Sequence, residues 1–133
     1  MTDTVAVAEK IVELWAYFAV KTCVYSRPPL DHPGGRDWLQ ITLVEEFRGR
    51  IGGVVVDTLE SPDVPLPLTV ACLCVHGIIR ACNAEFAPIA GRVATAAAAG
   101  EGVNEIARAA VAEAEPHLRA AVSLAVERAV LRG

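Results

Sequence analysis

One stretch of the chain, from position 69 to position 85, constrains the fold more than any other because it is apolar and has a helical period. It reads TVACLCVHGIIRACNAE, and polar side chains recur in it at steps of three and four residues: Thr69, Cys72, His76, Arg80 and Asn83. These steps place the five side chains, here called the polar stripe, on one face of a helix. The other positions are too apolar for a surface helix, and buried polar groups need hydrogen-bond partners. We therefore expect the polar stripe to face an interior or a cleft.

Length and composition indicate a single domain. The chain has 133 residues, of which 53% are hydrophobic and 21% are charged, so it can bury a core and does not belong to the disordered class. We expect one helical domain over residues 1–133. The net charge is −4 and the basic residues are scattered along the chain, so no surface for a nucleic acid is indicated.

The N-terminal segment and the longest apolar run indicate a cytoplasmic protein. The acidic Asp3 and the pair Glu9 and Lys10 are atypical of a signal peptide. The apolar run 66–79 is interrupted by His76 and is shorter than the roughly 20 residues that cross a membrane. We expect it to be a core helix and expect no membrane partner. The excess of arginine over lysine and the many alanines are typical of a GC-rich bacterial genome.

Neither a metal nor a cofactor is indicated by the motifs. The four cysteines lie in apolar surroundings, and we expect them to be reduced and to act as small hydrophobic residues, without a disulfide. Cys72 and His76 are one helical turn apart and could share an ion, but Cys74 would point elsewhere. Phosphate-binding, dinucleotide-binding and zinc-protease motifs are missing, as is a nucleophile elbow. ATP, NAD and flavin are therefore not expected.

A first helix is predicted to start within residues 2–4 and to run to about Tyr25, with an apolar stripe on one side. Its other side carries Glu9, Glu13, Tyr17 and Lys21 at steps of four. This side is either a solvated face with weak ion pairs, or it places Glu13, Tyr17 and Lys21 in the same cleft as His76. Both interpretations stay open.

Residues 27–37, RPPLDHPGGRD, contain three prolines and two glycines and must form a loop. Because ligand-binding residues concentrate in such loops, this loop with Asp31, His32 and Arg36 is a candidate ligand lid. A plain connector is the alternative.

After this loop, Asp37 is expected to cap a second helix that reaches Glu60. The competing prediction is one short strand at Ile51–Thr58, because three valines are consecutive there and glycines precede them. Three glycines at positions 49, 52 and 53 would also allow another helix, or a twofold mate, to approach closely.

Two further prolines are expected to divide the C-terminal half of the chain. Pro88 should kink or end the central helix, and Pro116 should kink the following one or begin the last. The prediction is an all-α fold, a compact bundle of five to seven helices. The high apolar content would leave apolar patches on a monomer of this size, so we expect a homodimer.

The polar stripe supplies the groups that cofactor-free proton transfer needs. His76 would act as acid or base, Arg80 would hold a developing negative charge, and Glu13 is one of several candidate carboxylates. The expected substrate-binding residues are Asn83, Thr69, Tyr17, Lys21, Arg27 and His32.

Three functions follow from these residues. The first is a small enzyme that isomerises, cyclises or adds to a metabolite or peptide intermediate in a bacterial biosynthetic pathway. The second is a module that binds such a small molecule or peptide without turnover. The third is a structural or partner-binding helical dimer in which Arg80 pairs with Glu13 or Glu46.

Overall fold

The computed structural model describes residues 3–25 and 32–133, and within them the fold is all-α. Four helices follow one another along the chain: α1 (Thr4–Tyr25), α2 (Gly35–Glu60), α3 (Leu68–Ala98) and α4 (Val103–Arg132). The all-α prediction is confirmed, whereas the predicted number of five to seven helices is wrong.

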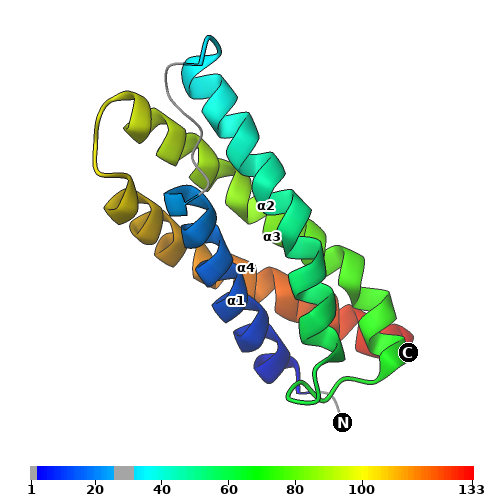
Figure 1. Ribbon diagram of the computed structural model, residues 1–133. Helices are drawn as coiled ribbons and strands as arrows, with labels where there is room; N and C mark the ends of the chain where they lie inside the picture. Colours follow the sequence, from blue (N-terminus) through cyan, green and yellow to red (C-terminus); the bar gives the residue numbers. More distant parts are fainter. Residues whose placement is uncertain (1–2, 26–31) are drawn as a thin grey trace.

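The helices form an up-and-down bundle in which each helix is antiparallel to the next (Figure 1). α3 packs against α2 and α4, α1 packs against α4 and α2, and α1 and α3 lie on a diagonal. The rings of Phe47 on α2 and Phe86 on α3 stack with centroids 4.0 Å apart. Between α3 and α4, a Cβ placed on Gly77 would lie 3.6 Å from the Cβ of Ala125. Each of the four helices therefore contributes one face to a shared core.

The helix count is smaller than predicted because neither helical proline ends its helix. Pro88 lies inside α3 and Pro116 inside α4. A proline removes one backbone N–H, which leaves the carbonyl four residues earlier without its helical partner. Both prolines are exposed, as are Ala84 and Ala112, which carry the two freed carbonyls. Water can solvate these carbonyls, so the helices continue through both prolines.

The competing prediction of a strand at 51–58 is wrong, because these residues form the second half of α2. Ile51, Val55 and Leu59 recur at a step of four and are all buried. That period places them together on the inner face of a helix, whereas a strand would place the exposed Gly53 and Asp57 on the same face as these buried side chains. Burial of this apolar face outweighs the low helix propensity of the valines and glycines.

The helix ends follow local chemistry. The carboxylate of Asp3 accepts a hydrogen bond from the Ala6 N–H at 3.0 Å and so caps α1. α2 begins at Gly35, two residues earlier than the expected cap at Asp37, and Gly35 has a φ of 55°. After α3, Gly100 has a φ of 73°, a conformation that favours glycine.

The centre of the bundle is held by Trp15 of α1, which is fully buried. Its Nε1–H donates a hydrogen bond of 3.0 Å across the diagonal to the carbonyl oxygen of Cys82 on α3. This bond satisfies the one polar atom of the indole ring and fixes the rotation of α1 relative to α3.

Among the described helices, α3 is long and apolar enough to cross a membrane by length and composition alone, and 28% of that apolar segment is buried in the bundle. The core helix of a soluble protein meets the same criterion.

Candidate functional site

The polar stripe of α3 faces outward. Thr69, Cys72, His76 and Arg80 are exposed, and Asn83 is half-buried. The prediction that the stripe faces an interior or a cleft is therefore wrong. The physical reason is that α3 packs between two neighbours, so its apolar positions cover a wide arc and the polar stripe occupies what remains.

Arg80 does not act as an internal strut within the described part of the chain. No hydrogen bond or ion pair joins the side chain of Arg80 or His76 to another described residue. Glu46 instead lies 3.9 Å from Arg50, one turn further along α2. Neither His76 nor Arg80 lines any of the cavities described below.

The residues predicted on α1 lie away from the polar stripe. Glu13 and Tyr17 are exposed and Lys21 is half-buried. Tyr17 and Lys21 face α4 and line a groove with it, whereas Trp15 points to α3. The structure thus does not bring Glu13, Tyr17 and Lys21 into one cleft with His76.

The loop candidates differ in what the structure shows of them. Arg27 and Asp31 lie outside the described residues. His32 is exposed and its ring stacks on that of Trp38 with centroids 3.8 Å apart. The Gly34 N–H donates a hydrogen bond of 3.0 Å to Nδ1 of His32, so His32 shapes the entry to α2.

The groove between α1 and α4 has a volume of about 500 Å³. Ligand sites commonly measure about 300–1,000 Å³. Apolar residues and charged or phenolic residues from the two helices line it together: Ala16, Tyr17, Val20, Lys21, Tyr25, Arg108, Val111 and Glu115. On α1 these residues recur at helical steps, so the groove runs along one flank of the helix.

The floor and the sides of this groove differ in chemistry. Val111 is buried, Ala16 and Val20 are half-buried, and these three give an apolar floor. At the side, 58% of Tyr17 and 79% of Tyr25 are exposed. Such an arrangement accommodates an apolar body between aromatic rings.

The charged residues of the groove are not engaged with each other. Lys21 Nζ lies 5.5 Å from the centroid of the Tyr17 ring, within the range of a cation–π contact. The side chains of Lys21, Arg108 and Glu115 form no hydrogen bond or ion pair with another residue of the described ranges 3–25 and 32–133. The groove therefore presents two cations and one carboxylate to whatever enters it.

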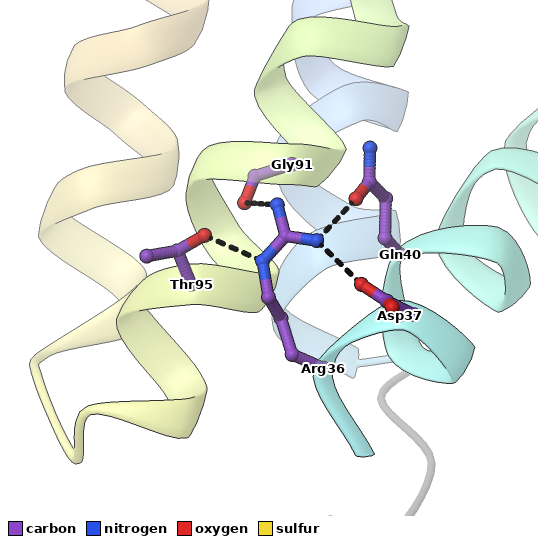
Figure 2. A network of polar contacts seen from close by, with 5 residues as sticks. All are labelled: Arg36, Asp37, Gln40, Gly91 and Thr95. Carbon is purple, nitrogen blue, oxygen red and sulfur yellow. Dashed lines mark hydrogen bonds and ion pairs between the residues drawn. The ribbon is translucent and has the colours of Figure 1, made fainter. Parts of the chain in front are cut away.

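In a second cavity, of about 530 Å³, the arginine side chains are hydrogen-bonded to other residues. Arg36 of α2 lines it, and its guanidinium is held from several directions (Figure 2). Nε donates to Thr95 Oγ1 at 2.8 Å, and Nη1 donates to Asp37 Oδ1 at 2.9 Å and to Gln40 Oε1 at 2.7 Å. Nη2 lies 3.4 Å from the Gly91 carbonyl oxygen.

The other arginine of this second cavity is also paired, since Arg92 lies 2.8 Å from Glu113. These contacts hold the C-terminal part of α3 to the start of α2 and to α4. The two arginines of this cavity are thus paired across helices, whereas Lys21 and Arg108 of the α1–α4 groove form no ion pair with another described residue.

Two further hollows are present among the described residues. One of about 310 Å³ lies between α1 and α2, with Lys10 and Asp57 in its lining. A groove of about 130 Å³ between α2 and α3 is mostly apolar, with Cys72 at its edge. Burial raises the pKa of the Cys82 thiol to about 12 and also raises that of Cys74, so neither is a reactive thiolate near neutral pH. Within the described residues, no three His, Cys, Asp or Glu side chains gather as a metal site requires.

Arg108 and Glu115 were not among the site residues predicted from the sequence. They lie two turns apart on one flank of α4, with Val111 between them, and that spacing was visible in the sequence. What was not visible is that α1 and α4 are neighbours, which brings this flank beside Tyr17 and Lys21. No protein family, curated protein or solved structure matches the chain.

Proposed function

We propose that this protein is a binding module for a small organic anion, which it holds in the groove between α1 and α4. The observation that carries the proposal is a pair of cations, Lys21 and Arg108, that line an apolar-floored groove and form no ion pair with another described residue. A guanidinium and an ammonium on opposite walls can hold one carboxylate from two sides.

The apolar part of the ligand is accommodated by the same groove. Val20 and Val111 offer an apolar floor and Tyr17 a ring for stacking. Apolar contact and charge pairing together favour an organic acid with a hydrophobic body over a small inorganic anion.

The enzyme predicted from the sequence has less support than this binding module. General acid–base catalysis gains from a site that excludes water, whereas His76 and Arg80 are exposed on the outer side of α3. Acid–base chemistry by the polar stripe stays a prediction, as does a cytoplasmic location.

Titration calorimetry with hydrocinnamate tests the proposed function, because this probe combines one carboxylate with one apolar ring. We expect a Kd on the order of 1 mM for a ligand of this size. Replacing Lys21 or Arg108 by Met retains the aliphatic stem and removes the charge. Each change should weaken binding about five- to tenfold, since a charge-assisted hydrogen bond at a partly exposed site is lost.

The matched controls are one variant and one ligand. Arg48→Met removes an exposed arginine of α2 that lies outside the groove and should leave the Kd unchanged. Hydrocinnamamide lacks the charge and should bind too weakly to measure. Equal binding of acid and amide, or equal loss in the Arg48 and Arg108 variants, would refute an anion site in this groove.

A further inference from the structure

The charges of the α1–α4 groove are separated along its length. On α4, Arg108 and Glu115 both line the groove and are two helical turns apart, which corresponds to about 10 Å along the axis. Side chains of one helix lean in the same direction, so the two charges keep this separation. The groove therefore has one positive and one negative position along α4.

The register of α1 against α4 adds to this polarity. Glu9 of α1 lies 2.8 Å from Arg119 of α4, which fixes the level at which the two antiparallel helices meet. Lys21 is about 18 Å from Glu9 toward the C-terminal end of α1, and Arg108 is about 17 Å from Arg119 toward the N-terminal end of α4. Because the two helices are antiparallel, these two displacements have the same direction. Lys21 and Arg108 are thus at the same end of the groove.

The same register places the acidic groups at the other end. Glu115 lies about 6 Å from Arg119 along α4, and Glu13 lies about 6 Å from Glu9 along α1. Glu115 lines the groove, whereas Glu13 is exposed at a similar level of α1 and does not line it. One end of the groove thus carries two cations, and the other end carries the carboxylate of Glu115.

We propose that the groove recognises a zwitterion, namely a short peptide of about three residues with free termini. An extended chain of three residues spans about 10 Å, which matches the separation between Arg108 and Glu115. The peptide carboxylate lies between Lys21 and Arg108, its ammonium group lies at Glu115, and its central side chain packs on Val20 and Val111. Glu115 repels the second negative charge of a dianion such as a phosphate monoester.

This inference rests on the proposed function, because it assigns the ligand class of the same groove. The test compares three forms of one peptide by calorimetry: Ala-Phe-Ala with free termini, its N-acetylated form and its C-terminal amide. We expect the free peptide to bind about five- to tenfold more tightly than the acetylated form. The amide should bind more weakly than the free peptide because it cannot pair with Lys21 and Arg108.

The variant Glu115→Gln tests recognition of the peptide ammonium group independently of carboxylate binding by Lys21 and Arg108. It should weaken binding of the free peptide to the level of the acetylated form and leave hydrocinnamate binding unchanged. The control is Glu127→Gln, which changes an exposed residue of α4 outside the groove. It should leave the Kd of both the free peptide and hydrocinnamate unchanged.

The outcomes distinguish this inference from the proposed function. If free and acetylated peptides bind equally while hydrocinnamate still needs Arg108, the groove binds anions and the zwitterion proposal is wrong. Weakening of the free peptide by Glu127→Gln to the same extent as by Glu115→Gln also overturns it. If neither the peptides nor hydrocinnamate bind, both proposals fail.

Discussion

At the scale of single residues, the surroundings of each arginine decide what it does. The guanidinium of Arg36 is surrounded by oxygen atoms of α2 and α3 (Figure 2), so it holds two helices together. Arg80 and Arg108 have no partner among the described residues. Of these two, Arg108 lines one of the grooves between described helices and Arg80 lines none of those described above, which is why the proposed site is at Arg108.

This difference predicts the stability of two variants. Arg36→Ala should lower the free energy of unfolding by about 1–2 kcal/mol, because several hydrogen bonds of a half-buried guanidinium are lost. Arg80→Ala should change it by less than about 0.5 kcal/mol, as is usual for an exposed residue without a partner. Urea denaturation of both variants measures these values. A loss of several kcal/mol in Arg80→Ala would support the internal strut that the structure does not show.

The buried thiol of Cys82 predicts how stability depends on pH. Burial raises its pKa from the ordinary 9.0 to about 12 in the folded protein, so above pH 9 the unfolded chain loses this proton first. The free energy of unfolding should therefore be unaffected by this thiol below pH 9. It should fall as the pH rises from 9 toward 12, by at most about 1.4 kcal/mol per pH unit.

Urea denaturation at several values between pH 8 and pH 10.5 measures this slope. Cys82→Ala leaves a small cavity and lowers stability at every pH, but its slope above pH 9 should be flatter than that of the unchanged protein. Identical slopes would show that Cys82 does not contribute.

At the scale of helices, periodicity predicted where helices lie better than it predicted where they end. The start of α1 near Asp3 and its end at Tyr25 agree with the sequence, because capping and apolar spacing are local properties. Pro88 and Pro116 did not end their helices, since the outcome depends on whether the freed carbonyl meets water. That depends on the rotation of the helix in the bundle, which a single sequence does not reveal.

The glycines of α2 give a prediction at this scale. A Cβ added at Gly53 would meet nothing within 4 Å, so Gly53→Ala should raise the free energy of unfolding by about 0.5–1 kcal/mol. Gly100 has a φ of 73°, and Gly100→Ala should lower it by about 1 kcal/mol. Thermal or urea denaturation measures both.

Native mass spectrometry of the same Gly53 variant tests the predicted homodimer. If the unchanged protein is a dimer and Gly53→Ala dissociates or destabilises it, the glycines of α2 contact a second copy of the chain. If the variant is stabilised and keeps the same number of subunits, this face of α2 does not contact a second copy of the chain.

At the scale of the whole molecule, the site depends on which helices are neighbours. The polar stripe was correctly placed on one face of a helix, yet periodicity does not indicate whether a face points inward or outward. Tyr17 and Lys21 belong to the proposed groove, but they meet Arg108 and Glu115 only because α4 closes the bundle against α1 (Figure 1). That pairing joins the two ends of the chain and is a property of the assembled fold.

The most direct test of the central claim is a titration of the ¹⁵N-labelled protein with hydrocinnamate, followed through its backbone amide resonances. The proposed function predicts shifts that saturate and concentrate in residues 16–25 of α1 and 108–115 of α4. Shifts centred on His76 and Arg80 would instead locate the site on the outer face of α3. The absence of shifts at several millimolar hydrocinnamate would contradict an anion-binding groove.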